Sequence, residues 1–249
     1  MIRFLICWAL IATSASAWEV ESERERGNLE GGATAWERRL KDGNASVAVS
    51  GVSFSSRSHT LEVADIVPPA RKKLAEVARE AGALAGCNAS YFHKDFRPLG
   101  LVISGSQAVH GQERAKLLSG ILAVRGGRIE LVRSAAFRPG SDVSAAIQAG
   151  PWLVEDGTAI EGLDSLKRAR RTIVVTDGRG RWALVATSPV TLADAAVLLA
   201  SGVAVPGWPV RDALNLDGGS STALWAATSP ELLIPEYGYV RNFLLVFPK

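Results

Sequence analysis

The chain has 249 residues, 47% of them hydrophobic, which favours one sizeable core and argues against global disorder. Its formal net charge is only +3, and the basic residues are scattered apart from Lys167 to Arg171, so no extended nucleic-acid-binding surface is expected. The three histidines lie far apart and lack the spacing of metal ligands, which disfavours a histidine-built metal site.

Residues 1–17 are typical of a secretory signal peptide. Arg3 forms a short positive region, residues 4–12 are apolar, and residues 15–17 match a small-residue cleavage site. We therefore expect a secreted or periplasmic mature protein. The apolar run is too short to span a bilayer, so no stable membrane insertion is expected after cleavage. Cys87 is the one cysteine that the mature chain would keep, which excludes an internal disulfide.

Residues 18–45 are largely polar and charged, and we interpret them as a solvated arm or a first helix. Residues 46–249 are expected to form one domain. Apolar runs predict strands at 46–55, 59–64, 83–87, 121–124, 129–132, 172–176, 181–187 and 240–247. Helical periodicity predicts helices at 70–81 and, after an N-cap at Thr191, up to Ala200. Without regular βαβ alternation, the expected class is α+β, with a mixed or antiparallel sheet and a few packed helices.

The stretch 212–222 joins the end of a buried strand to Asp217, two glycines and three hydroxyl side chains. Gly218 and Gly219 can adopt positive φ and allow a ligand to approach the backbone closely. The following N–H groups could form an anion-binding nest. An ordinary Asp-Gly-Gly turn between two strands is the alternative for this tripeptide alone. The hydroxyl side chains are those of Ser220, Ser221 and Thr222.

Polar residues also follow the apolar strand 83–87. Asn88 comes directly after it, and its amide could orient a sugar hydroxyl or a phosphate oxygen. A turn-capping role for Asn88 is equally open. Tyr91 and Phe92 offer faces for a sugar ring, but packing in the core is the favoured interpretation for both aromatic side chains.

Two more strand ends carry candidate residues. Gly150 precedes a proline and could line a pocket, although a simple turn is equally open. Arg171 and Thr172 open the strand 172–176, and an arginine at a strand end can bind a phosphate through two hydrogen bonds. The remaining basic residues of this run are interpreted as solvated surface: Lys167, Arg168 and Arg170.

Taken in order, these motifs resemble those of the phosphodiester glycosidase family over roughly residues 45–248. The motifs are Asn88 with Tyr91 and Phe92, Gly100 to Val102, Gly150 with Pro151, Arg171 with Thr172, and Asn215 to Gly219. Each is weak alone, and their order is specific. Ala89 and Ser90 stand where the family often has glycines, and Ser220 stands for a third glycine. These departures narrow the space for a ligand and concern the substrate more than the site.

The resemblance implies a hydrolase that cleaves a sugar-1-phosphodiester at the glycosidic C–O bond and releases free sugar and a phosphomonoester. The leaving phosphate needs charge stabilisation, which Arg171 and the N–H groups near Gly218 could provide. Asp217 is the candidate base or electrostatic stabiliser at the oxocarbenium-like centre, and Asn88 would orient sugar or phosphate. Asp212 is the weaker carboxylate, since its odd spacing from Asp217 directs it to the opposite strand face. The expected substrate-binding residues are Gly150, Thr172, Gly218, Gly219, Ser220 and Ser221.

Other functions remain open on the sequence. One is a phosphodiesterase that cleaves the P–O bond in a cell-envelope polymer. Another is a non-catalytic module that binds phosphorylated glycans, which the substitutions at Ala89, Ser90 and Ser220 leave open. Each predicts a phosphorylated glycan, small or polymeric, as the partner, and no nucleic acid. Asp217 could also hold a divalent cation, so a metal requirement stays open.

Overall fold

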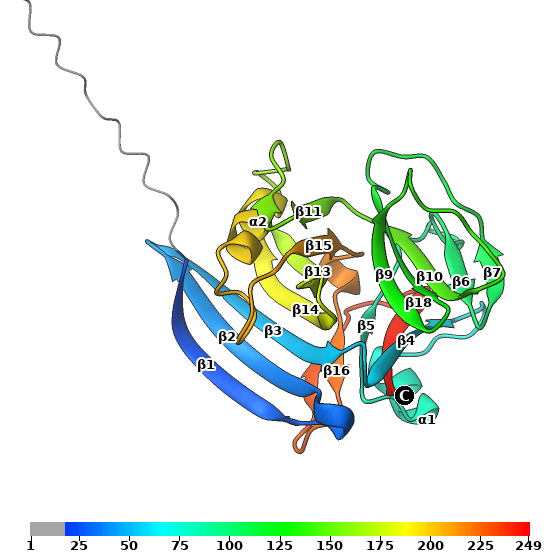
Figure 1. Cartoon of the computed structure of the whole chain (residues 1–249), viewed down its shortest axis with the longest axis horizontal. Helices are drawn as coiled ribbons and strands as arrows, with labels where there is room; N and C mark the ends of the chain where they lie inside the picture. Colours follow the sequence, from blue (N-terminus) through cyan, green and yellow to red (C-terminus); the bar gives the residue numbers. More distant parts are fainter. Residues whose placement is uncertain (1–17) are drawn as a thin grey trace, which may run out of the picture.

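The computed structural model describes residues 18–249, so the predicted signal peptide at 1–17 lies outside the described residues. The described chain folds into three antiparallel sheets of eight, five and five strands, with short helices against their outer faces (Figure 1).

The eight-stranded sheet has the order β1-β2-β3-β14-β13-β15-β11-β12. Its strands are β1 (Glu19–Asn28), β2 (Thr34–Asp42), β3 (Ala45–Ser55), β11 (Trp152–Glu155), β12 (Thr158–Ala159), β13 (Ala169–Thr176), β14 (Arg181–Val190) and β15 (Asp212–Asn215). The sheet β7-β6-β10-β8-β9 contains β6 (Val102–Ser104), β7 (Gln107–His110), β8 (Gly120–Arg125), β9 (Arg128–Arg133) and β10 (Val143–Ala149). The sheet β17-β16-β5-β18-β4 contains β4 (His59–Asp65), β5 (Ala85–Asn88), β16 (Leu224–Ala226), β17 (Leu232–Ile234) and β18 (Asn242–Pro248).

The expected α+β class is wrong, because the chain is mostly β. Among residues 18–249 only α1 (Leu74–Ala81) and α2 (Leu192–Ala200) are α-helices, beside eighteen strands. The expectation underestimated the strands because several have three or four residues, too short for a period-of-two pattern to stand out. The antiparallel pairing was one of the two arrangements expected.

Residues 18–45 form neither a solvated arm nor a helix. They contribute β1 and β2, which pair along almost their whole length. Opposite charges face each other across this pair, as in Glu23 with Arg38 and Glu19 with Lys41. Such cross-strand pairs favour a strand, and charge on an edge strand discourages pairing with other chains. The charge run is therefore the sign of an edge hairpin, whose second strand buries Trp36.

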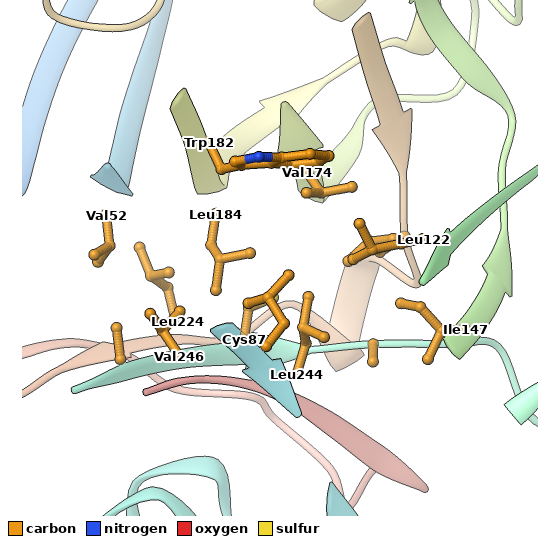
Figure 2. Packing of buried hydrophobic residues seen from close by; sticks show 14 of the residues in the cluster. Val52, Cys87, Leu122, Ile147, Val174, Trp182, Leu184, Leu224, Leu244 and Val246 are labelled. Atoms are coloured by element: carbon orange, nitrogen blue, oxygen red, sulfur yellow. The ribbon is translucent and has the colours of Figure 1, made fainter. Parts of the chain in front are cut away.

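The main core lies where the three sheets face one another (Figure 2). The eight-stranded sheet contributes Val52, Val174, Trp182 and Leu184, and the five-stranded sheets contribute Cys87, Leu122, Ile147, Leu224, Leu244 and Val246. Burial raises the pKa of the Cys87 thiol, so this side chain acts as a small apolar residue of the core.

The two helices confirm the helical periods and two of their capping signals. α1 ends at Gly82, whose φ of 69° is left-handed, and packs Leu74 against Trp225 and Phe243. Thr191 caps α2, since its side chain accepts a hydrogen bond from the Asp194 N–H. α2 covers the other face of the eight-stranded sheet. No helix within residues 18–249 is long and apolar enough to cross a membrane.

Three strand ends meet at one place in this framework. β13 pairs with β15, with Ile173 opposite Asn215, and the Leu216 N–H continues the pairing with the Thr172 carbonyl at 2.8 Å. The Asp217 N–H then donates to the carbonyl of Ala89, just beyond β5, at 3.0 Å. The chain segments that carry most of the predicted site residues therefore converge here.

Candidate active site

Asn88 joins the three strand ends. Its Oδ1 accepts hydrogen bonds from the Thr172 hydroxyl at 2.6 Å and from the Ala223 N–H at 2.9 Å. Its Nδ2 donates to the Asp217 carbonyl at 2.6 Å. The side chain is fully buried, and both acceptor positions of its oxygen are occupied. The geometry therefore gives Asn88 and Thr172 a positioning role for the loop after β15, and not the direct substrate contact expected from the sequence.

Asp217 is the carboxylate of this cluster. It is half-buried, and one of its oxygens accepts a hydrogen bond from the Gly218 N–H at 2.8 Å. Burial raises its pKa from the ordinary 3.8 to about 6, while hydrogen bonds from Ser221 and Gly218 oppose that rise. A carboxylate with this pKa is mostly ionised at neutral pH and basic enough to accept a proton.

The loop after Asp217 leaves two backbone donors without protein partners. Ser221 N–H bonds the Gly218 carbonyl at 3.2 Å. In the described part of the chain, the N–H groups of Gly219 and Ser220 have no hydrogen-bond acceptor. Gly219 has a φ of +64°, and a Cβ there would meet nothing within 4 Å, so this backbone is open. The loop can therefore offer two N–H groups to an oxyanion, within the segment where the sequence predicted a nest.

Tyr91 closes the other side of the cluster. Its hydroxyl lies 2.5 Å from the Gly150 carbonyl and 3.1 Å from the Leu216 carbonyl, and it accepts from Asn215 Nδ2 at 2.9 Å. Burial, then the negative charge of Asp217, raises the pKa of Tyr91, so the hydroxyl stays protonated. The favoured interpretation of Tyr91 as a core residue missed this polar role.

Gly150 fits the cluster only as glycine. Its φ is +155°, and an added Cβ would lie 2.0 Å from the Leu117 carbonyl oxygen. Its own carbonyl accepts from Tyr91 and, at 3.1 Å, from Asn215 Nδ2. Gly150 thus supports the site through its backbone and close packing, and the pocket-lining role expected from the sequence stays a prediction.

Arg171 and Thr172 point to opposite faces of β13, as neighbours on a strand do. Arg171 is 8% exposed and donates to the carbonyls of Val190 at 3.1 Å and Lys167 at 2.8 Å. Within residues 18–249 it forms no ion pair with a carboxylate, and its Nη1 makes no hydrogen bond. Burial lowers its pKa, and the electrostatic effects of Tyr91 and Asp164 oppose this shift. Arg171 is therefore a buried cation that makes no direct ion pair in the described residues, and Asp164 acts on it at longer range.

Two further features of the site were not predicted. Arg170, interpreted as solvated surface, donates to the Thr222 carbonyl and at 2.9 Å to the Pro235 carbonyl, so it braces the Asp217 loop. Asn215 Oδ1 and Thr222 Oγ1 are buried and have no hydrogen-bond partner in the described residues. Unsatisfied buried polar atoms are rare and mark functional or strained sites. The sequence of the loop alone predicted neither the hydrogen bonds of Arg170 nor the two buried oxygen atoms without partners.

Three residues that depart from the family pattern remain to be placed. Ser220 lies on the exposed side of the site, and Ala89 and Ser90 are buried. Ser220 is exposed, and its carbonyl accepts from the Tyr237 N–H at 2.8 Å. Ala89 and Ser90 are buried, and Ser90 bonds Asn242 Oδ1 through its N–H at 2.9 Å and its hydroxyl at 3.1 Å. These two departures from the family pattern therefore pack against β18. Of the three substitutions that kept a binding module open, Ser220 alone faces solvent beside Asp217.

The described residues bring few metal-coordinating side chains together. Among residues 18–249, no group of three or more His, Cys, Asp or Glu side chains is placed to hold a metal. Asp212, the weaker carboxylate candidate, lies at the other end of β15 and accepts from the Asp156 N–H at 3.1 Å. A divalent cation at Asp217 would therefore need ligands other than clustered side chains.

Three solved structures share this fold. The catalytic domain of zebrafish N-acetylglucosamine-1-phosphodiester alpha-N-acetylglucosaminidase, auto-inhibited by its pro-peptide, superposes with a TM-score of 0.62 at 17% identity, over 95% of this chain and 85% of that one. A hypothetical protein from Synechocystis gives 0.59 at 18%, over 87% of this chain. A putative exported protein from Burkholderia pseudomallei K96243 gives 0.58 at 12%, over 85% of this chain and 74% of that one. The match spans 62% of the Synechocystis chain.

At these identities the structures establish a shared fold alone. The sequence assigns the family directly: the phosphodiester glycosidase family model matches residues 81–247, so the chain belongs to that family of hydrolytic enzymes. This confirms the resemblance of the five ordered motifs. No curated protein sequence matches the chain.

Proposed function

We propose that this protein hydrolyses a sugar-1-phosphodiester at the glycosidic C–O bond, releasing free sugar and a phosphomonoester. The observation that carries the proposal is the half-buried Asp217, with a pKa of about 6, next to two unpartnered backbone N–H groups. Membership in the phosphodiester glycosidase family supports the same substrate class. The site thus combines a base with an anion-binding loop, as this reaction requires.

The reaction breaks the bond between the anomeric carbon and the phosphate oxygen, and a water oxygen forms the new bond to that carbon. Asp217 accepts a proton from the water, or stabilises the positive charge at the anomeric carbon as the bond lengthens. The electron pair leaves with the phosphate, which is already a weak base. Because no second carboxylate bonds to this cluster in the described residues, protonation of the leaving group is assigned no side chain.

The departing phosphate needs positive partners. The N–H groups of Gly219 and Ser220 have no acceptor in the described residues, so they are available to an oxyanion. Arg171 makes no direct ion pair in the described residues, and an anionic substrate would supply a closer negative partner than Asp164. Because two of its nitrogens already bind backbone carbonyls, Arg171 would act mainly through its charge and through Nη1.

The first test is release of N-acetylglucosamine from UDP-GlcNAc by the mature protein, with and without a chelator. We expect Asp217→Asn and Arg171→Ala to lose activity, whereas Asp212→Asn, at the other end of β15, serves as the matched control and keeps it. Turnover that survives both site substitutions would overturn the assignment of Asp217 and Arg171. Loss on chelation alone would identify a metal requirement.

The bond cleaved distinguishes this proposal from phosphodiesterase chemistry. Hydrolysis in ¹⁸O-labelled water puts the label in the sugar if the C–O bond breaks, and in the phosphate if the P–O bond breaks. Label in the phosphate would refute the glycosidase mechanism. Saturable binding of the substrate without any product, under conditions where the fold is intact, would favour a binding module.

We also propose that the protein acts outside the cytoplasm, after cleavage behind Ala17. The support is the sequence pattern of residues 1–17. Mass spectrometry of the protein purified from its source would give an N-terminus at Trp18 if this is correct. An intact N-terminal Met1 in the cytoplasmic fraction would contradict it.

A further inference from the structure

A second polar cleft lies at the opposite end of β13 and β15 from Asp217. It has a volume of about 790 Å³ and opens where three hairpin turns meet, those of β3–β4, β8–β9 and β13–β14. Thr176 and Asp212, at the far ends of the two strands, line it. Since a strand rises about 3.4 Å per residue, the cleft is on the order of 10–20 Å from the Asp217 loop.

Each of the three turns places one arginine in this cleft: Arg57, Arg128 and Arg179. All three are exposed, and within residues 18–249 none of their side chains makes a hydrogen bond, an ion pair or a ring contact. Unpaired arginines from separate segments converge on one hollow here, whereas most arginines of the β1–β2 hairpin are paired with carboxylates.

The negative side chains of the cleft contact arginines other than these three. Glu130 accepts from Arg125, outside the cleft, at 3.0 Å. Asp212 lies 3.7 Å from Arg211, which itself bonds Asp156. The three guanidinium groups therefore make no direct ion pair with a carboxylate of the cleft, and together with Arg211 and Lys249 they leave its lining net positive.

The walls of the cleft are held in place, although its arginine side chains are not. Asp177 accepts from the N–H groups of Arg179 at 2.7 Å and Arg181 at 2.9 Å, which closes the β13–β14 turn. Burial alone would raise the pKa of Asp177, but these bonds and the Arg181 side chain lower it, so Asp177 stays ionised. Lys249 Nζ bonds the carbonyls of Ser56 at 2.6 Å and Gly127 at 3.0 Å, joining the other two turns.

The buried side of the cleft is apolar and rigid. Trp182 lines it, and its ring lies beside Val174 in the main core (Figure 2). At its exposed edge, Gly178 has a φ of +70°, a left-handed conformation that favours glycine. The result is an opening with long cationic side chains at its rim, and such side chains can bind phosphate oxygens through paired N–H groups.

We propose that this cleft is a second anion site, which binds phosphoryl groups of an extended phosphorylated glycan while another linkage of the same chain lies at Asp217. The assignment to a glycan rests on the proposed function, whereas the anion site rests on the arginines alone. A substrate with repeated phosphates would reach both places, and one with a single phosphodiester would occupy only the Asp217 site.

The anion site is tested by calorimetric binding of inorganic tripolyphosphate, which contains no sugar. We expect the triple variant Arg57→Gln, Arg128→Gln, Arg179→Gln to weaken binding at least about tenfold. The matched control is Arg24→Gln, Arg39→Gln, Arg97→Gln, which removes the same charge from exposed positions elsewhere. Equal binding by the cleft variant and wild type, or equal loss in the control, would overturn the proposal.

The glycan assignment is tested by hydrolysis of an oligomer of phosphodiester-linked N-acetylglucosamine and of UDP-GlcNAc. The cleft variant should raise KM for the oligomer about tenfold and leave kcat and the UDP-GlcNAc reaction unchanged. An oligonucleotide with the same number of phosphates is the competitor. Tighter cleft-dependent binding of the oligonucleotide than of the oligomer would refute the glycan assignment. Tripolyphosphate binding without hydrolysis of either sugar substrate would instead refute the proposed function alone.

Discussion

The two ends of the β13–β15 pair are built in opposite ways. At the Asp217 end, Asn88 alone makes three hydrogen bonds that join β5, β13 and the loop after β15. At the cleft end, Arg57, Arg128 and Arg179 make no side-chain bonds in the described residues. One end fixes a carboxylate within a network of polar groups, and the other presents free charges to solvent.

This difference separates two tasks that the same strands can serve. Catalysis requires reacting groups that are held in place before the substrate binds. Binding of an anion requires only positive charges on side chains long enough to contact it. Substitutions at the Asp217 end should therefore change catalysis and stability together. Substitutions at the cleft should change binding of long anions and little else.

The largest expected effect is loss of activity in Asp217→Asn. The amide keeps the shape of the carboxylate and can still accept from the Gly218 N–H, but it cannot accept a proton. We expect kcat for UDP-GlcNAc hydrolysis to fall by about 10²–10⁴, the range typical of a lost general base. Asp212→Asn is the control, and an equal loss in that variant would mean that the reaction does not depend specifically on Asp217.

The pH profile should report the same carboxylate. Because the pKa of Asp217 is about 6 and the ionised form is the reactive one, kcat/KM should be constant above pH 7 and fall about tenfold per pH unit well below pH 6. Measurement of initial rates between pH 4 and pH 9 checks this. Activity that instead rises as the pH falls through 6 would assign Asp217 as an acid.

Removal of the Asn88 side chain should reduce stability. Asn88→Ala leaves the Thr172 hydroxyl, the Ala223 N–H and the Asp217 carbonyl without partners in a fully buried place. We expect the free energy of unfolding to fall by about 2–4 kcal/mol, measured by urea denaturation. Asn44→Ala, at an exposed turn, should cost less than about 0.5 kcal/mol. Equal values for the two variants would show that the network is not rigid.

Asp217 itself should cost stability at neutral pH. Its pKa is raised in the folded state, so folding favours the protonated form; this contribution is complete below pH 3.8 and is lost as the pH rises through about 6. Asp217→Asn should therefore stabilise the protein at pH 8 by about 1–2 kcal/mol, after discount for partial solvent access, and should have no such effect at pH 3.5. Thermal denaturation at the two pH values decides the point.

Much of the site could be predicted from strand ends and glycines in the sequence. Asp217, Gly150 and Thr172 lie together because each follows or begins an apolar strand, and in antiparallel sheets such ends can meet. What the sequence could not give is direction. As neighbours on a strand, Arg171 and Thr172 must face opposite sides, but only the hydrogen bond from Thr172 to Asn88 shows which of them faces the Asp217 loop.

The rest depended on contacts that are distant along the chain. On the sequence alone, the charges of residues 18–45 favoured a helix or an arm. The structure instead pairs β1 with β2 and places Glu23 opposite Arg38. Tyr91 was expected in the core because an aromatic residue near a strand is usually buried, and the carbonyls that its hydroxyl contacts lie 59 and 125 residues away. Local patterns contain no information on such partners.

The smallest expected effect completes the comparison. The triple substitution of Arg57, Arg128 and Arg179 by glutamine removes no hydrogen bond or ion pair within residues 18–249, so it should change the free energy of unfolding by less than about 0.5 kcal/mol. A small gain is expected at low salt, since three like charges in one cleft repel each other, and added salt should remove that gain. A loss of about 2 kcal/mol or more would mean that these arginines support the fold, as Asn88 does, and that the two ends are alike.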